Sequence, residues 1–224
     1  MTVDPQWTDE IWKALYTVEE AGLDSITVEQ WEVIPEDVCR DHELDRGRLI
    51  KRQSGTPGHQ SAARRLENAV ESQARKAVAE GRYGCLTTSQ DLDVRLWEVP
   101  PTIRRPDVLV YKCIEPGGRV WTDDVLLAVE IVSPASEATD TNKPDSRNGY
   151  QPKMAQYALA GIECYWIVWL TPNDTAIHRI QEWRLVKGLG EYKLRSETVN
   201  LLDETAVSTP MPFPIEITYA ELEF

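Results

Sequence analysis

The stretch LLAVEIVSP, residues 126–134, decides the fold of this chain, together with RRPDVLVY at residues 104–111. Both are short apolar runs rich in β-branched residues, which predicts strands buried on both faces of a sheet. Each run contains a carboxylate that the apolar pattern does not need, Asp107 in one and Glu130 in the other. Because a buried charge is costly unless it is paired or binds a metal, Glu130 is either a metal ligand or a structural carboxylate in an ion pair or at a strand end.

The length of 224 residues suffices for one sizeable α/β domain or two small ones. No apolar run approaches the ~20 residues that span a bilayer, and the acidic N-terminus lacks the order of a signal peptide. The cysteines are dispersed without a CxxC pair, and we interpret them as reduced thiols: Cys39, Cys85, Cys113 and Cys164. We therefore expect a cytoplasmic protein that does not contact a membrane.

The net charge of −13 argues against tight binding to a polyanion by the chain as a whole. The middle of the chain differs, because residues 40–105 carry thirteen basic and nine acidic side chains. This middle third is the candidate face for a nucleic acid, although a moderate local excess of this kind is more often a solvated helix face.

Three segments show helical periodicity. Residues 1–38 are predicted to form an acidic helical extension, in which Thr27 can cap a second helix. Its first helix rests on four apolar positions, Ile11, Trp12, Leu15 and Val18. Residues 60–80 predict an amphipathic helix that Gly81 ends, and residues 152–160 predict a short helix that begins with a proline.

The remaining segments predict strands and turns. We expect hairpins around Asp45–Gly47 and around Lys187–Gly190, and a short strand or helix in the tail at 210–224. Residues 86–97 alternate between apolar and polar side chains, which predicts one half-buried strand. Residues 100–107 are predicted to be a loop. Residues 164–170 form an apolar run, which predicts a buried strand. With no repeat or linker, the expected organisation is an N-terminal extension at 1–38 and one domain at 39–224.

Asp107 and Glu130 fall on adjacent predicted strands. Two carboxylates side by side raise each other's pKa unless a cation lies between them. Hard oxygen ligands suit Mg²⁺ or Mn²⁺, whereas the three scattered histidines make no zinc motif. The sequence contains no dinucleotide-binding glycine motif, phosphate loop or nucleophile elbow.

Several phrases, in this order, resemble the Uma-type restriction endonuclease family of the PD-(D/E)XK nuclease superfamily. They are LDRGRLI, GHQSAARRLENAV, RRPDVLVY, VEIVSPAS, KMAQYALAGIECYWIV and PFPIEI, and they cover roughly residues 40–217. The resemblance implies an α/β fold with a restriction-endonuclease-like core, in which helices flank a mixed central sheet, preceded here by the helical extension. It also implies hydrolysis of phosphodiester bonds with a divalent metal, Mg²⁺ or Mn²⁺.

The resemblance also implies site residues. Asp107 and Glu130 match the metal-binding carboxylates. The superfamily's lysine two residues after the glutamate is replaced here by Val132, and the Uma-type family supplies a lysine from the following helix, where Lys153 matches. Lys143 in the preceding segment is the alternative. His59 matches the histidine at the start of the first core helix.

Glu43 matches the acidic residue of the family's hairpin, whereas Arg48 stands where the family usually has a second acid.

Two functions follow as hypotheses. The first is a Mg²⁺-dependent endonuclease acting on DNA, as a homodimer by default, with six basic residues available to phosphates: Arg64, Arg65, Arg75, Lys76, Arg104 and Arg105. The second is a non-catalytic module with this fold that acts in protein assembly, which the acidic charge and the eight tryptophans favour.

Overall fold

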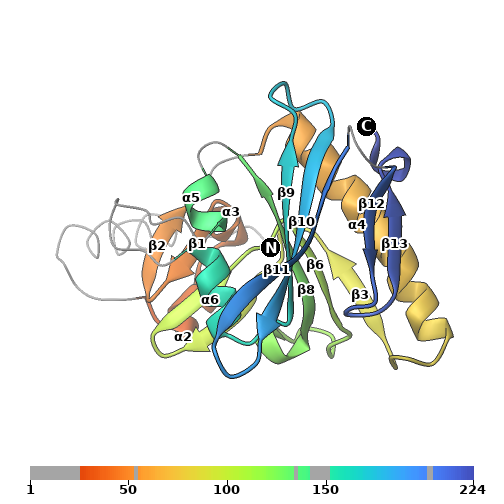
Figure 1. Ribbon diagram of the computed structural model, residues 1–224. Helices are drawn as coiled ribbons and strands as arrows, with labels where there is room; N and C mark the ends of the chain where they lie inside the picture. The colour runs from red at the N-terminus through yellow and green to blue at the C-terminus, as the bar shows by residue number, and fades with distance from the viewer. Residues whose placement is uncertain (1–25, 53–54, 134–135, 142–151, 201–203) are drawn as a thin grey trace. The chain divides into compact units, whose positions relative to one another are not determined.

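In the computed structural model, the described residues are 26–52, 55–133, 136–141, 152–200 and 204–224 (Figure 1). The chain divides into two compact units, residues 1–52 with 97–103 and residues 53–96 with 104–224. The first predicted helix, around Trp12, and the alternative lysine, Lys143, lie outside the described residues.

The first unit begins with two short helices, α2 (Val28–Val33) and α3 (Glu36–Arg40). Thr27 caps α2 as predicted, because its hydroxyl accepts the Gln30 N–H at 3.2 Å while the Gln30 side chain accepts the Thr27 N–H at 2.8 Å. This reciprocal pair satisfies two N–H groups that a helix start leaves open. The apolar core of the unit consists of Ile26, Trp31, Cys39, Leu44 and Ile103.

The predicted hairpin is present as β1 (His42–Asp45) and β2 (Arg48–Lys51), with Arg46 and Gly47 at positive φ in its turn. Residues 100–107 were wrongly predicted to be a loop, since β5 (Pro101–Arg104) pairs with β1. The prolines of this segment suggested a turn, but proline is tolerated as the first residue of a strand.

The second unit is built on a six-stranded sheet in the order β11-β10-β9-β8-β6-β3. Its strands are β3 (Leu86–Ser89), β6 (Val108–Lys112), β8 (Val125–Val132), β9 (Cys164–Leu170), β10 (Ile177–Val186) and β11 (Glu191–Val199). β8 and β9 are parallel and the other neighbours are antiparallel, so the sheet is mixed. All eight residues of β8 are buried, as its apolar run predicted.

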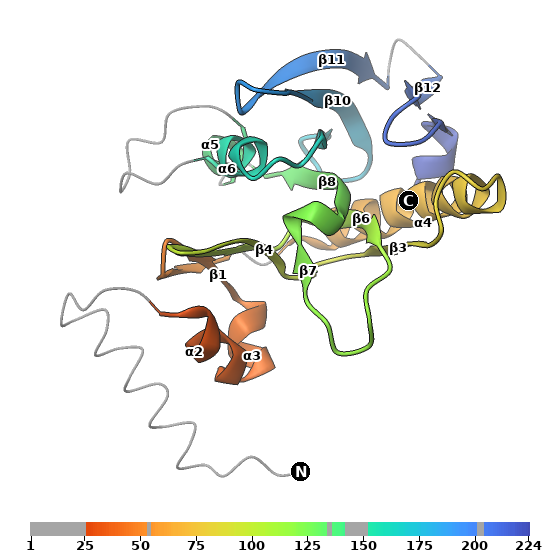
Figure 2. The same ribbon diagram turned by 90° about the horizontal axis from the view of Figure 1, so that it is seen from below.

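Helices cover both faces of this sheet (Figure 2). The long helix α4 (Pro57–Ala79) packs on one face, where its apolar side chains join Leu127, Val129 and Ile131 of β8 in the main core. The other face carries α6 (Lys153–Leu159), which follows α5 (Glu137–Asp140). Alternate residues of a strand point to opposite faces, so Glu130 points away from α4 and toward α6.

The tail contains both kinds of structure expected for it. β12 (Thr205–Thr209) and β13 (Ile215–Thr218) form a hairpin that lies alongside α4 (Figure 1). A 3₁₀ helix at Ala220–Leu222 follows. Gly81 ends α4 at φ 74°, as predicted for a residue that must adopt a left-handed conformation.

Residues 86–97 were wrongly predicted to be a single strand. They form two strands, β3 and β4 (Val94–Glu98). β4 pairs with β7 (Val120–Trp121), which is followed in the chain by a 3₁₀ helix at Thr122–Asp124. Asp91 between them has φ 50°, which interrupts the extended backbone. Because alternation simply continues across this break, the periodicity did not reveal it.

The prediction that all cysteines are reduced is wrong for two of them, because Cys85 and Cys113 form a disulfide with 5.5 Å between their Cα atoms. Leu86 of β3 pairs with Lys112 of β6, so the preceding and following cysteines face each other just beyond the paired strands. Their separation of 28 residues hid this relationship. Among the described residues, no helix is long and apolar enough to cross a membrane.

Candidate active site

Two buried carboxylates meet where β6 begins and β8 ends. Val108 pairs with Val129, so the antiparallel register places Asp107 next to Glu130. The side chains are almost inaccessible, with 7% of Asp107 and 1% of Glu130 exposed. Asp107 Oδ2 accepts the backbone N–H of Ile131 at 2.6 Å, which fixes the carboxylate against β8.

Lys153, the first residue of α6, reaches Glu130 from the adjacent helix. Its Nζ lies 3.3 Å from Oε1 and 3.2 Å from Oε2 of Glu130. Tyr157, one turn later on the same helix face, donates its hydroxyl to Glu130 Oε1 at 2.8 Å. The ammonium and the hydroxyl together compensate the charge of the buried carboxylate. Without such partners, a charge inside this strand would be costly.

A third acid, Asp140 of α5, also lies near Lys153. It is 2% exposed, and its Oδ1 is 3.8 Å from Lys153 Nζ. The Tyr165 hydroxyl donates to its backbone carbonyl at 2.7 Å. Burial first, and then the charges of Glu130 and Asp140, raise the pKa of Tyr165 well above its usual value.

Sequence analysis missed Asp140 because it lies in a polar segment where an acid is unremarkable. The one feature that could have pointed to Asp140 was its position in the connection between the strand of Glu130 and the helix of Lys153. Nothing in the periodicity predicted that this side chain would be buried.

His59 lies in the first turn of α4, where the Thr56 hydroxyl accepts its backbone N–H at 3.1 Å. Its Nε2 is 3.3 Å from Asp107 Oδ2, while its Nδ1 is buried without a partner among the described residues. Burial alone lowers the pKa of His59, but the hydrogen bond and charge of Asp107, together with the charge of Asp91 and the Ile131 backbone, outweigh it, so the net pKa is raised above 6.5. A Cβ at Gly55 would come within 2.7 Å of Nδ1, so this glycine lets the chain pass beside the ring.

The remaining predicted residue, Glu43, belongs to the first unit. It lies on β1, opposite Ile50, with 2% of its surface exposed, and its Oε1 is 3.9 Å from Arg52 Nε. The second unit thus brings together four of the five predicted residues, Asp107, Glu130, Lys153 and His59. A role for Glu43 in the site stays a prediction.

Two of the predicted phosphate-contacting residues are buried. Arg104 is 3% exposed and donates from Nε to the Gln156 amide oxygen at 2.7 Å, while Arg105 is 4% exposed and pairs with Asp93. The prediction that they bind phosphates is therefore wrong, because burial and pairing occupy both guanidinium groups. Gln156 belongs to α6, so the Arg104 contact ties the helix that carries Lys153 to the end of β5.

The acidic side chains of this cluster form a candidate donor set for a metal. Among the residues that the structure describes, no three His, Cys, Asp or Glu side chains are arranged to hold an ion by themselves. Mg²⁺, however, usually keeps several waters and uses only one or two carboxylates. The two buried carboxylates of Asp107 and Glu130 therefore fit this hard-oxygen chemistry.

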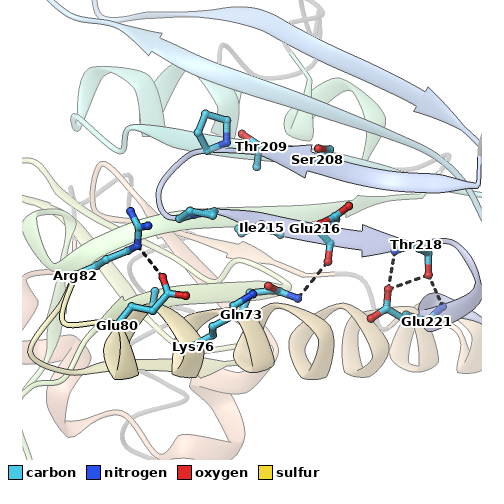
Figure 3. A pocket seen from close by; sticks show the side chains of 13 residues that line it. Gln73, Lys76, Glu80, Arg82, Ser208, Thr209, Ile215, Glu216, Thr218 and Glu221 are labelled. Atoms are coloured by element: carbon cyan, nitrogen blue, oxygen red, sulfur yellow. Dashed lines mark hydrogen bonds and ion pairs between the residues drawn. The ribbon is translucent and has the colours of Figure 1, made fainter.

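A cavity of about 650 Å³ lies elsewhere, between the C-terminal half of α4 and the β12–β13 hairpin (Figure 3). Its polar groups are largely paired with one another: Arg82 with Glu80 at 2.9 Å, and Gln73 with the Glu216 carbonyl at 3.1 Å. None of the residues Asp107, Glu130, Lys153, His59 and Glu43 lines it, whereas Lys76, one of the predicted phosphate-contacting residues, does. The chemistry-bearing side chains and this cavity are separate features of the second unit.

The fold is a mixed α/β fold that is also found in a solved structure. It resembles the crystal structure of a "putative nuclease belonging to DUF820" from Anabaena variabilis, with a TM-score of 0.55 and 16% identity, over 88% of this chain and 97% of that one. No curated protein matches the chain.

The particular family follows from the sequence. The family model described as "Putative restriction endonuclease" (Uma2) matches residues 28–217. The chain belongs to this family, and the resemblance drawn from its motifs is confirmed.

Proposed function

We propose that the protein is a metal-dependent endonuclease that hydrolyses phosphodiester bonds of DNA. The observation that carries the proposal is the contact of Lys153 Nζ with Glu130 at 3.2 Å, beside Asp107, on a buried strand, β8, that is otherwise apolar. Two acids and a lysine at one point are the groups that phosphodiester hydrolysis needs for binding a metal and stabilising charge. The family supports the same activity.

Each side chain has a proposed role. Asp107 and Glu130 would hold Mg²⁺ or Mn²⁺, which supplies a Lewis acid for the phosphate and lowers the pKa of bound water. Lys153 orients the attacking water or neutralises the charge that develops on the phosphate. Tyr157 holds the Glu130 carboxylate through its hydroxyl, and His59 holds Asp107.

Plasmid cleavage tests the proposal. Supercoiled DNA is incubated with wild type in Mg²⁺, Mn²⁺ or EDTA, and we expect nicked and linear products with metal alone. Lys153→Met should abolish cleavage. Lys187→Met is the matched control, because Lys187 also pairs with a glutamate, Glu163, but is 80% exposed at the surface.

A second candidate is a non-catalytic module acting in protein assembly. The observation that favours it is that Lys153 already neutralises Glu130, so the buried acid has a structural explanation without a metal. Wild type that binds Mn²⁺ weakly and cleaves neither DNA nor RNA would support this module over the nuclease. The homodimer and the cytoplasmic location stay predictions from the sequence, and sedimentation analysis tests the first.

A further inference from the structure

The face of the sheet that carries Glu130 continues into an aromatic and cationic surface. Glu130 pairs with Ile167 of β9, which pairs with Gln181 of β10, which pairs with Glu197 of β11. The neighbouring row consists of Val132, Trp169, Arg179 and Val199. Residues that pair across a ladder, and residues two apart on one strand, point to the same face, so both rows share the face of Glu130.

Trp169 and Arg179 form a stack in the second row. The Arg179 guanidinium carbon lies 3.9 Å from the centre of the Trp169 ring, which is cation–π geometry. With neighbouring strands about 4.8 Å apart and alternate residues nearly 7 Å apart along a strand, Trp169 is about 8 Å from Glu130. The stack is thus about one nucleotide from the candidate site.

The stack is oriented and still accessible. The Glu197 carboxylate lies 3.8 Å from Arg179 Nη1 and also accepts a hydrogen bond from Gln181, so it links the side chains of the two rows. One third of the Arg179 side chain remains exposed, at 33%. Arg179 Nε has no hydrogen-bond partner among the described residues, so the contact with the Trp169 ring and the Glu197 ion pair position the guanidinium.

We propose that the Trp169–Arg179 stack binds an unpaired nucleobase of the substrate beside the reactive phosphate, so that the preferred ligand is single-stranded or locally opened DNA. This inference rests on the proposed nuclease function for its biological meaning. A guanidinium plane backed by an indole offers a base both stacking and cation–π contact, and stacking tolerates any sequence. A paired base inside a duplex keeps its faces covered and could not use this surface.

Binding without cleavage tests the inference. In EDTA, fluorescence anisotropy measures the affinity for a 20-nucleotide oligothymidine, an abasic strand of the same length and charge, and a 20-base-pair duplex. Trp169→Leu should weaken oligothymidine binding about 5- to 100-fold and leave the abasic strand within twofold. Trp169→Phe should retain most of the affinity. Arg179→Lys, which keeps the charge without the plane, should lose part of it.

The matched control is Trp121→Leu, because Arg95 lies 5.4 Å from the centre of the Trp121 ring in a second arginine–tryptophan pair. This variant should bind like wild type. An equal loss on the abasic strand, no loss on oligothymidine in a folded Trp169→Leu protein, or tighter binding to duplex would overturn the inference. Wild type that shows this base-dependent binding but never cleaves would remove the nuclease proposal and leave the stacking surface standing.

Discussion

Asp140 Oδ1 lies 3.8 Å from Lys153 Nζ, so the ammonium faces a second buried carboxylate besides Glu130. We interpret Asp140 as a positioning residue that acts through Lys153. Asp140→Asn should lower kcat for cleavage about 10- to 100-fold, the effect of a small misplacement of a reacting group, and leave KM unchanged. Asp140→Glu should recover part of the rate. Asp123→Asn, at an exposed acid, is the control, and a change confined to KM would contradict a positioning role.

The metal site gives a direct measurement. Asp107→Asn should weaken Mn²⁺ binding in titration calorimetry by at least about 10-fold, since even outer-shell changes at metal sites often cost that much. Asp107 and Glu130 are neighbours in the antiparallel register, so Glu130→Gln should have a similar effect. Equal affinity of Asp107→Asn and wild type would place the metal elsewhere.

Lys153 is also expected to stabilise the fold. Removing one partner of a buried ion pair leaves an uncompensated charge and typically costs about 3–5 kcal/mol, and Glu130 is 1% exposed. Lys153→Met should therefore unfold at lower denaturant concentration in EDTA. Saturating Mn²⁺ should restore more stability to this variant than to wild type, because the metal then compensates Glu130 alone. An identical Mn²⁺ response in both proteins would argue against a shared carboxylate.

The stability of the metal-free protein should depend on His59. Its pKa is raised above 6.5 in the folded state, so its contribution is fully present below pH 6.5 and is lost as the pH rises through the folded pKa. The difference in free energy of unfolding between wild type and His59→Gln should thus be constant at low pH and shrink above pH 6.5. Urea denaturation in EDTA measures it, with His178→Gln as control. A difference that grows with pH would reverse the assignment.

The exposed basic residues of α4 test where DNA binds. Arg64, Arg65, Arg75 and Lys76 are exposed, although Arg75 also contacts Glu71 at 2.7 Å. With duplex DNA as the ligand, each phosphate contact adds about 0.9 to the slope of log affinity against log salt. The four changes to Gln should therefore flatten the slope by up to about 3.6. An unchanged slope would place the DNA on another surface.

Much of the sheet was predictable because burial on both faces leaves a continuous apolar run. This is how β8 and the carboxylate of Glu130 became visible in the sequence. Lys153 and Tyr157 are four residues apart, a spacing that places both on one face of a helix, and both contact Glu130. The apolar pattern of a sequence is informative where the burial of a strand or helix can be read from its own residues.

Three of the misses share a cause, since each depends on a contact between segments distant in sequence. The disulfide required the register of β3 against β6. The burial of Arg104 required Gln156, 52 residues later. Asp140 is buried through Lys153 and Tyr165, whose positions depend on the crossover between the parallel strands β8 and β9. Local patterns do not contain such information.

The order of the residues along the chain has a consequence for synthesis. Asp107 and Glu130 leave the ribosome before Lys153 and Tyr157, the groups that compensate Glu130 in the finished protein. Closing β6 on β8 at that stage would bury Glu130 without a counter-charge, which is costly. We therefore expect the nascent sheet to stay open at this end until α6 has emerged. Lys153, the lysine proposed for catalysis, would then also be the group whose synthesis allows β6 to close on β8.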